Sequence, residues 1–512
     1  MTLAHRAVAV PRRAPAATPL SGSGTGDSAV RWGMPSEFLR DGYIRAVAAI
    51  TLVGLIARTV WLGHQPLWRD EAFTALVSRR SWSGMFDAVR HDSGTPLSYV
   101  ATHLATSVSN SAAALRLPAA LLGTAAIPLC AALARRLGGN RAGICGAAVA
   151  AVAPTLLLSA RDARMYAMAG TLVMAMTLTL WSAVERPDTG RLAAHAGVVA
   201  AALMTHWLAA VPVLMGVGAA VVALRADRRT TLRVAAASAL GGLVLLLLWV
   251  PFATAQLQHG SDGFWVQPVD GQQLLGVLTQ YLAGPAVDSD LPQRGLIINL
   301  QAGALIAASI AGALVLFLLP WDTSERRRGI ALVTLVGLGS VVVLLLVSLR
   351  HPILDARYAS VMWGPLFALL GLGLSRLRWA AVIPLAAMGA ASLALCWYPT
   401  RADVATLVHD QLDGRVGGND LVVASADSYL QVLVDADPAT AARTRVGAAS
   451  LPWYWGVAAF PPDAFLDHIP AGAGTIYVIT QPGDGMPPLP ADHVDAGSHC
   501  ATRVCVEVYL PR

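Results

Sequence analysis

Long apolar runs, separated by short loops rich in arginine, constrain this chain more than any other feature. A helix of about 20 apolar residues is long enough to cross the hydrocarbon core of a bilayer. Of the 512 residues, 55% are hydrophobic and 13% are charged, whereas soluble domains carry roughly 25% charged residues. The sequence therefore predicts an α-helical protein that crosses the membrane many times.

We predict about eleven transmembrane helices. The first, residues 44–62, follows Arg31 and Arg40 and has Arg45 at its start. It has no convincing cleavage site, so we interpret it as an uncleaved span and not as a signal peptide. The other predicted spans are 118–137, 142–158, 165–184, 192–206, 207–224, 232–251, 296–319, 330–349, 358–374 and 379–397. A weaker run, 97–108, is predicted to be a helix at the membrane surface.

The loop arginines predict the orientation in the membrane. With a cytoplasmic N-terminus, every dense arginine cluster between spans lies inside, as the positive-inside rule requires. Counting 97–108 as a span would invert these loops. We therefore expect a multi-pass plasma-membrane protein in which loops 63–117 and 253–295, and everything after residue 399, lie outside the cytoplasm.

Three regions follow. Residues 1–40, rich in Ala, Pro, Ser, Gly and Arg, are predicted to be a disordered cytoplasmic tail. Residues 41–399 form the transmembrane domain. Residues 400–512 carry thirteen acidic residues against six arginines, with strand-like runs at 421–425, 475–480 and 504–510 and helix-like runs at 402–412 and 428–435. We predict a small extracytoplasmic α/β domain there, acting as a lid, an acceptor-binding module or a structural support.

Two of the five cysteines, Cys500 and Cys505, lie close together in the last region. In an oxidising compartment a disulfide across a hairpin is expected between them. Cys130, Cys145 and Cys396 lie in apolar runs and are interpreted as packing residues. No cysteine spacing suggests a zinc site.

Polar side chains gather on the outer side of the predicted membrane. Carboxylates there can act as a general base, and arginines can bind a phosphate in bidentate fashion. Their common side indicates one outward-facing site built from several loops. The candidates are Asp70, Glu71, His91, Asp92, Asp162, Arg164, Tyr166, His206, Arg357 and Tyr358.

Several short motifs occur in order along these loops. The motifs are W-x-D-E-A at 68–72, a degenerate H-x-P-P-L at 91–99, R-L-P at 116–118, S-x-x-D-x-R-x-Y at 159–166, T-H-W at 205–207 and R-Y at 357–358. This series resembles the GT-C superfamily of polyprenyl-phosphate-sugar glycosyltransferases, which includes the protein O-mannosyltransferase-like group and the bacterial lipid A and arabinofuranosyl transferases. The resemblance covers roughly residues 61–374.

The resemblance implies a role for Asp70. In that family the first-loop aspartate deprotonates an acceptor hydroxyl, which then attacks the anomeric carbon of a lipid-phosphate sugar with inversion. Glu71 would orient the acceptor or tune Asp70 through its like charge, or is an exposed carboxylate without a role. Asp162 would be a further catalytic carboxylate or a partner of Arg161 or Arg164.

The remaining candidates are expected to bind donor or acceptor. Arg357 is the leading phosphate ligand and Arg164 the second, the alternative being interfacial arginines whose charged ends reach water. His206 binds phosphate or acceptor, or is a structural histidine. Tyr166 and Tyr358 line the site or belong to the aromatic belt. His91 and Asp92 stand in the degenerate motif.

The expected partners are a polyprenyl-phosphate-linked sugar, an envelope glycan, glycolipid or protein acceptor, and membrane lipid. Mannose is the leading sugar, and arabinofuranose or another pentose is the alternative. Nucleic acid is not expected, because the basic residues lie in cytoplasmic loops. No cofactor is required, and adjacent carboxylates that could bind a divalent ion lack a full ligand set. A transporter or flippase would show internal repeats and broken helices at mid-membrane, and the sequence shows neither feature. A non-catalytic assembly factor is a further alternative.

Overall fold

The computed structural model describes residues 42–512 except 255, 257–264, 286–292 and 319–322. The predicted tail 1–40 lies outside the described residues, as does part of loop 253–295. Within the described part, seven helices are long and apolar enough to cross a membrane. The prediction of a polytopic helical membrane protein with a small C-terminal α/β domain is confirmed.

The seven helical stretches are α1 (Gly42–Thr59), α5 (Ala112–Val152), α7 (Tyr166–Glu185), α10 (Arg228–Leu248) with η3 (Val250–Phe252), α13 (Arg294–Leu318), α14 (Ser324–Thr334) continuing through η4 (Leu335–Gly339) into α15 (Ser340–Ser348), and η5 (Arg378–Ala381) with α18 (Val382–Trp397). Their exposed surface is rich in leucine, isoleucine and valine, as expected of side chains that face lipid.

The predicted count of about eleven spans exceeds these seven for two reasons. Runs 118–137 and 142–158 both fall largely in α5, which consists of two helices that meet at Gly139, where φ is +80°; glycine adopts this conformation without strain. The second helix folds back on the first, because a Cβ added to Gly146 would lie 2.7 Å from the Cβ of Ala134. These two predicted runs are therefore two helices that are counted as one among the seven. Three further runs form helices that are shorter than 18 residues each. They are α8 (Thr189–Thr205), η2 (Trp207–Ala209) with α9 (Ala210–Val222), and α16 (Ala356–Trp363) with α17 (Leu366–Leu374).

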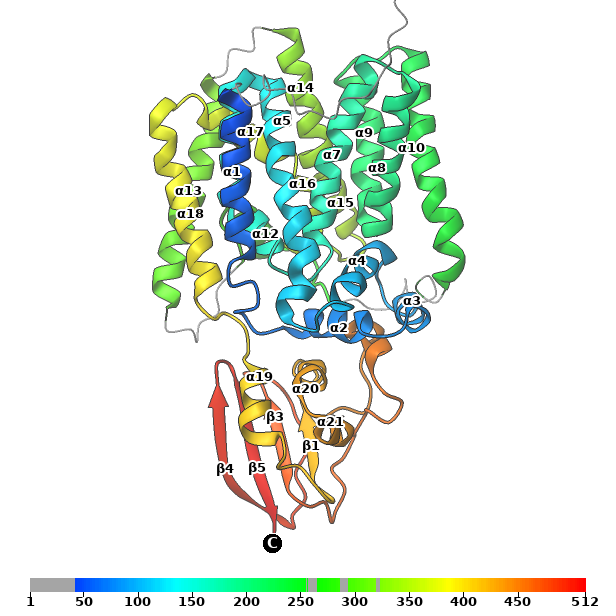
Figure 1. Ribbon diagram of the computed structural model, residues 1–512, viewed down its shortest axis with the longest axis vertical. Helices are drawn as coiled ribbons and strands as arrows, with labels where there is room; N and C mark the ends of the chain where they lie inside the picture. Colours follow the sequence, from blue (N-terminus) through cyan, green and yellow to red (C-terminus); the bar gives the residue numbers. More distant parts are fainter. Residues whose placement is uncertain (1–41, 255, 257–264, 286–292, 319–322) are drawn as a thin grey trace, which may run out of the picture. The chain divides into compact units, whose positions relative to one another are not determined.

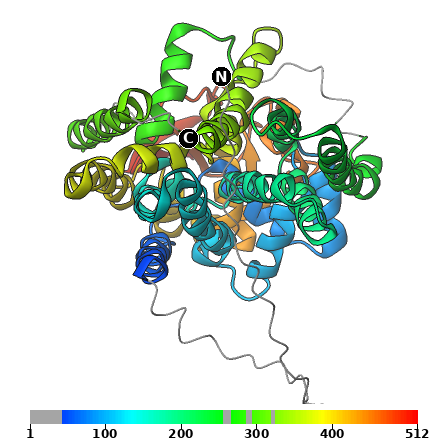
Figure 2. The same ribbon diagram turned by 90° about the horizontal axis from the view of Figure 1, so that it is seen from above.

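Helix packing relies on small residues. A Cβ added to Gly371 of α17 would lie 2.4 Å from the Cα of Gly146 in α5, so the two backbones are in direct contact, as at other membrane helix interfaces. By contrast, α1 packs mainly on α5 and stands at the edge of the bundle (Figure 2).

The loop after α1 folds into three short helices across one end of the bundle, α2 (Arg69–Ser78), α3 (Trp82–Arg90) and α4 (Pro96–Thr106) (Figure 1). With 11 residues, α4 is too short to span a bilayer, which agrees with the surface helix predicted at 97–108. Two more helices complete this side, α6 (Pro154–Ser159) and α12 (Gly271–Ala283).

The C-terminal domain is a five-stranded mixed sheet in the order β2-β1-β3-β5-β4. Strand β1 (Leu421–Ala424) pairs in parallel with β2 (Thr444–Val446) and β3 (Ile476–Thr480), and β5 (Val504–Pro511) runs antiparallel to β3 and β4 (His493–Ala501). The three predicted strands are confirmed, and β2 and β4 were not predicted. The helical elements are α19 (Val404–Leu407), η6 (Val408–Leu412), α20 (Tyr429–Asp435), α21 (Pro438–Arg443), η7 (Trp453–Trp455) and η8 (Val457–Ala459).

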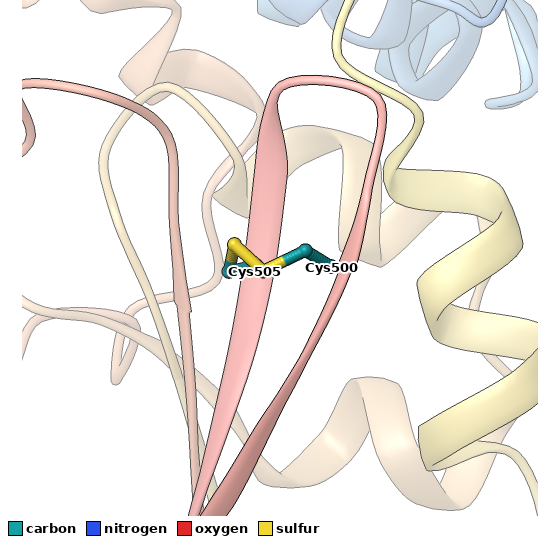
Figure 3. The surroundings of a disulfide bond; sticks show 2 residues. All are labelled: Cys500 and Cys505. Atoms are coloured by element: carbon teal, nitrogen blue, oxygen red, sulfur yellow. A yellow bond between two sulfur atoms is a disulfide. The ribbon is translucent and has the colours of Figure 1, made fainter.

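The β4–β5 hairpin carries a disulfide. Cys500 and Cys505 are directly opposed residues of the two strands, with their Cα atoms 4.1 Å apart, and their sulfur atoms are bonded (Figure 3). The turn between them touches the segment that leaves α18, because Asp403 N donates to Thr502 O at 2.9 Å.

The C-terminal domain is joined to the α2 loop by side-chain contacts. Gln431 of α20 donates from Nε2 to Leu67 O at 2.7 Å, and Arg69 Nη1 pairs with Asp427 Oδ1 at 2.8 Å. The segment between α18 and α19 is held in the same way, since Gln65 donates to Tyr398 O at 2.6 Å. These contacts fix the domain against the residues that build the candidate site.

Candidate active site

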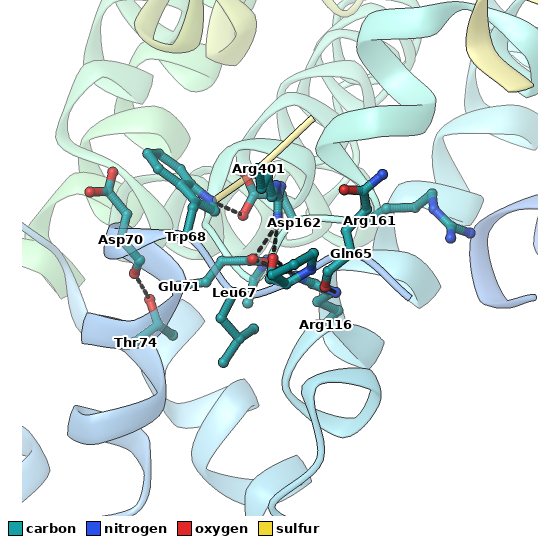
Figure 4. Close-up of polar contacts among 12 residues, drawn as sticks. Gln65, Leu67, Trp68, Asp70, Glu71, Thr74, Arg116, Arg161, Asp162 and Arg401 are labelled. Carbon is teal, nitrogen blue, oxygen red and sulfur yellow. Dashed lines mark hydrogen bonds and ion pairs between the residues drawn. The ribbon is translucent and has the colours of Figure 1, made fainter. Parts of the chain in front are cut away.

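The candidate site is centred on the first turn of α2, which contains Asp70 and Glu71. Carboxylates in the first turn are favoured by the partial positive charge of a helix N-terminus. Successive residues of a helix point about 100° apart, and the two side chains accordingly point in different directions (Figure 4). One ends in a buried ion cluster and the other at a cavity.

Glu71 is the centre of the buried cluster. Its side chain is 0% exposed, and that of Arg116 is 1% exposed. Arg116 donates from Nε to Oε1 at 2.7 Å and from Nη2 to Oε2 at 2.6 Å, and Ala163 N donates to Oε1 at 2.8 Å. Arg401 also donates to Oε2. We call Glu71, Arg116, Arg401 and Ala163 the Glu71 cluster.

Burial alone would raise the pKa of Glu71, but the charges of Arg401 and Arg116 and their hydrogen bonds outweigh it and hold the pKa at about 2. Arg116 further donates to the carbonyls of Leu62, Gln65 and Pro66 at 2.8–3.1 Å. Glu71 thus ties the start of α5, the α6–α7 loop and the C-terminal segment to the α2 loop. Its oxygens are occupied by protein donors, which argues against its predicted role in catalysis.

Asp70 has a different environment. Arg69 Nε lies 3.3 Å from Oδ1 and Arg357 Nη1 lies 3.4 Å from Oδ2, distances at which hydrogen bonds are weak. The Asp70 side chain is 19% exposed and borders a small cavity of about 50 Å³. It is therefore held in place but keeps lone pairs directed at open space.

Two cavities meet at this point. The small cavity is bordered by Asp70, Asp92, Arg164, Trp265 and, from the C-terminal domain, Tyr454 and Trp455. The large cavity, of about 230 Å³, is bordered by Arg161, Asp162, Thr400, Arg401 and the apolar side chains of Leu158 and Leu395. Tyr166 and Arg357 border both.

Arg357 stands at the junction of the cavities because its helix start is fixed. Asp355 caps α16, accepting from Arg357 N at 2.8 Å and from its Nε at 3.2 Å. The guanidinium lies 4.6 Å from the ring centroid of Trp265 and 5.5 Å from that of Trp68. Stacking and pairing orient its remaining donors.

Asp162 also borders the large cavity, but neither of its predicted partners contacts it. Trp68 Nε1 donates to Oδ1 at 3.2 Å, and Arg401 Nη2 lies 3.9 Å from Oδ2. Arg161 instead donates to the carbonyls of Ala57, Val60 and Trp61 at the end of α1. Burial, and then the negative charge of Glu71, raise the pKa of Asp162 to about 7, with Arg401 opposing the rise.

Arg164 supports Asp70 from behind. Its Nη1 donates to Thr74 Oγ1 at 3.1 Å and to Asp70 O at 3.3 Å.

Asp92 is buried, with 5% of its surface exposed. Its carboxylate accepts a hydrogen bond from Tyr99 OH at 3.2 Å, and burial raises the pKa of this carboxyl group. Both Arg164 and Asp92 border the small cavity.

The predicted histidines lie away from the cavities. His206 is buried, accepts from Leu208 N at 3.1 Å through Nδ1, and packs behind Tyr166 and Tyr358, with ring centroids 5.9 Å and 6.1 Å away. His91 is on the surface, with 58% of its side chain exposed and its ring beside Asp87. This exposed position, away from both cavities, does not support the prediction that His91 binds donor or acceptor.

Sequence reasoning missed several residues of the site. Arg116 belongs to the R-L-P motif but was not assigned a role. Its position just before a predicted span was the signal that could have identified it. Arg401 and Trp455 gave no signal, because they approach α2 from more than 300 residues away in the sequence. In the described part of the chain no group of three or more metal-ligating side chains occurs.

Comparisons with known proteins agree with the fold. A family model described as dolichyl-phosphate-mannose-protein mannosyltransferase matches residues 93–254. The structure of ArnT from Cupriavidus metallidurans in the apo state aligns with a TM-score of 0.59 at 15% identity, covering 92% of this chain and 98% of that one. The same protein bound to undecaprenyl phosphate gives a TM-score of 0.56 at 16% identity, covering 91% and 97%.

An oligosaccharyltransferase of Archaeoglobus fulgidus aligns with a TM-score of 0.54 at 12% identity, covering 87% of this chain and 70% of that one. No curated protein matches the sequence. The fold is that of the GT-C superfamily of membrane glycosyltransferases, and the resemblance predicted from the motifs is confirmed. The comparisons therefore establish the GT-C fold for this chain, and its activity, sugar and acceptor are taken up below as a proposal.

Proposed function

We propose that the chain transfers a sugar from a polyprenyl phosphate to an envelope acceptor, with Asp70 as general base. The observation that carries the proposal is the position of Arg357. It touches Asp70 and borders both cavities. A cation between a base and a larger cavity is where the leaving phosphate of a sugar donor would be neutralised.

The large cavity suits the donor. Four arginines, Arg116, Arg161, Arg357 and Arg401, border it together with the apolar side chains of Leu158 and Leu395. A lipid-linked sugar phosphate needs this combination, because arginine binds phosphate oxygens and the apolar wall accepts the prenyl chain. The bound undecaprenyl phosphate of the similarly folded Cupriavidus protein is consistent with such a donor.

The small cavity suits the acceptor. An acceptor hydroxyl placed there would give its proton to Asp70, and its oxygen would attack the anomeric carbon from the face opposite the phosphate. The bond from the anomeric carbon to the phosphate oxygen breaks, and the phosphate leaves with its electron pair beside Arg357. The product is a glycoside of inverted configuration, and no metal or redox step is needed.

The sugar and acceptor are proposed more broadly. Mannose is the leading sugar, in keeping with the description of the matching family, and arabinofuranose or another pentose is the alternative on the same fold. The acceptor is an envelope glycan, glycolipid or protein. We propose that the site faces outward, with a cytoplasmic N-terminus, because the arginine clusters between spans then lie inside.

The direct test incubates purified protein in detergent with radiolabelled polyprenyl-phosphate mannose or arabinofuranose and a cell-envelope fraction. Transfer of label by the wild type and its loss in Asp70→Asn support the proposal. Movement of intact labelled lipid across vesicle membranes without sugar transfer, unaffected by Asp70→Asn, would instead identify a flippase.

Reporter fusions test the orientation. A reporter fused after Arg512 should be active outside the cytoplasm, and one fused at Arg327 should be active inside; the reverse result would reject the proposed orientation.

A further inference from the structure

Four arginines border a cavity that has no part in the site described above. They are Arg141 after the bend of α5, Arg326 of α14, Arg376 after α17 and Arg378 of η5. The cavity measures about 320 Å³, and its other lining residues are Gly138, Leu372 and Ser375. None of the described residues that line it is acidic.

This arginine cavity lies at the opposite membrane face from Asp70. Arg116, in the Glu71 cluster, and Gly138, at the arginine cavity, belong to the same helix and are 22 residues apart. At about 1.5 Å per residue the helix rises roughly 33 Å between them, close to the thickness of the hydrocarbon core. Figure 1 likewise shows α14 and α2 at opposite ends of the bundle.

The charge of the cavity favours an anion. Arg141, Arg376 and Arg378 place three like charges beside one space, and an anion bound among them relieves their mutual repulsion. Arginine forks match phosphate oxygens in bidentate geometry. One wall is fixed, since Arg326 Nε donates to Leu137 O at 3.0 Å, and Ser375 adds a hydroxyl group beside the arginines.

An apolar surface begins where the arginines end. Trp379 follows Arg378 directly, and Val382 and Ile383 lie at the start of α18. Their exposed fractions are 81%, 66% and 68%. Tryptophan is typical of the membrane–water interface, and the two aliphatic side chains face lipid along α18. A ligand that fills the cavity with an anionic group can therefore lay apolar chains along this helix, which a free anion cannot do.

We propose that the arginine cavity binds the phosphodiester headgroup of an anionic glycerophospholipid, with its acyl chains against η5 and α18. Basic pockets between transmembrane helices are known sites for such headgroups. The site is separate from the glycosyl-transfer site and would anchor the bundle in the leaflet opposite to it. It does not depend on which sugar the protein transfers, or on whether it transfers one.

The test is native mass spectrometry of detergent-purified protein titrated with phosphatidylglycerol or phosphatidylcholine. The wild type should retain phosphatidylglycerol preferentially. The triple variant Arg141→Gln, Arg376→Gln, Arg378→Gln should lose affinity for it by about 100-fold, at roughly 1 kcal/mol per arginine, without change for phosphatidylcholine. Arg229→Gln removes an exposed arginine that lines none of these cavities, and it should bind like the wild type.

Two arms distinguish the occupants. Inorganic phosphate at millimolar concentration should not displace bound phosphatidylglycerol; if it binds as well as the lipid and competes with it, the site takes free anions and the proposal is wrong. Equal retention of phosphatidylglycerol by the triple variant and the wild type would also overturn it. Should the triple variant elute as an aggregate, Arg376→Gln alone should still weaken binding about fivefold.

Discussion

Asp70 and Glu71 are neighbours in the sequence with opposite surroundings. The Glu71 carboxylate is fully enclosed by two arginines and a backbone N–H, whereas the Asp70 carboxylate has two weak contacts and borders a cavity. A carboxylate whose lone pairs are all used can only hold the loop together. The adjacent one, kept in place but incompletely paired, can accept a proton.

The largest effect is expected for Asp70→Asn, which keeps the size of the side chain but removes the base. Turnover should fall by about 10²–10⁴-fold, while the melting temperature in detergent changes little, because no strong contact is lost. Initial rates of sugar transfer and a thermal unfolding curve measure the two quantities.

Asp87→Asn is the matched control for this variant. Asp87 is 63% exposed and lies 3.9 Å from His91, outside both cavities, so this variant should transfer sugar at the wild-type rate. Near-normal transfer by folded Asp70→Asn would show that the base is another residue, and Asp162 would become the first candidate.

Glu71→Gln should act on stability instead. Breaking a buried ion pair leaves uncompensated charge, here on Arg116 and Arg401, and typically costs about 3–5 kcal/mol. Urea or thermal unfolding in detergent measures this cost. Glu185→Gln, which breaks the surface pair with Arg136, should cost at most about 1 kcal/mol; equal stability of the two variants would refute the structural role of Glu71.

The pH dependence of stability separates the two regions again. The pKa of Glu71 is about 2 in the folded protein against 4.5 for the free group. Because the folded pKa is lowered, the contribution of the cluster is complete above pH 4.5 and is lost as the pH falls towards 2. The difference in unfolding free energy between wild type and Glu71→Gln should therefore narrow across this window. A difference that stays constant would mean that the charge of Glu71 does not stabilise the fold.

The contrast between the two carboxylates could not be read from the sequence. The periodicity of residues 69–78 places Asp70 and Glu71 on different sides of a helix. It does not show which of these sides faces a cavity. That is decided by Arg116 and Arg401, which reach Glu71 from 45 and 330 residues away. The apolar runs, the R-Y motif and the T-H-W motif are local signals, and these were predictable.

The same distinction holds for the C-terminal domain. Strands β1, β3 and β5 contain alternating or continuous apolar residues, and the sequence predicted them. Strand β2 has three residues, and β4 is an exposed edge strand with the polar sequence HVDAGSHCA. Strand β4 lacks a hydrophobic pattern because most of its residues are exposed, and β2, although Thr444 and Val446 are buried, is too short to show one. Strand β2 is placed by its pairing with β1, about 20 residues earlier in the chain, and β4 by its hairpin with β5.

Arg357→Ala tests the link between the cavities. It removes a charge-assisted partner of the donor phosphate, worth about 1.5–3 kcal/mol, so donor affinity should fall by roughly 10- to 150-fold, and the rate should fall as well. Arg350→Ala removes an exposed arginine from the preceding loop and should leave both unchanged. Donor binding measured with a non-transferable lipid phosphate separates affinity from rate, and unaltered binding by Arg357→Ala would exclude it as the phosphate ligand.

The smallest effect is expected from the disulfide. The Cys500–Cys505 bond closes a very short loop, so its removal should cost the C-terminal domain about 2 kcal/mol. The hairpin turn it closes contacts the segment that carries Arg401, since Arg503 Nη1 donates to Thr400 O at 3.4 Å and Asp403 N to Thr502 O at 2.9 Å. Loosening that turn should slightly weaken the ion pair between Arg401 and Glu71 and leave Asp70 unchanged.

A Cys500→Ser, Cys505→Ser variant should thus melt at a lower temperature yet transfer sugar within about twofold of the wild type, because a loss of 1 kcal/mol or less at Arg401 changes an equilibrium by only a few-fold. If thiol labelling finds both cysteines free in native protein, the disulfide does not form. A loss of transfer as large as that of Asp70→Asn would show that the C-terminal domain controls the base itself.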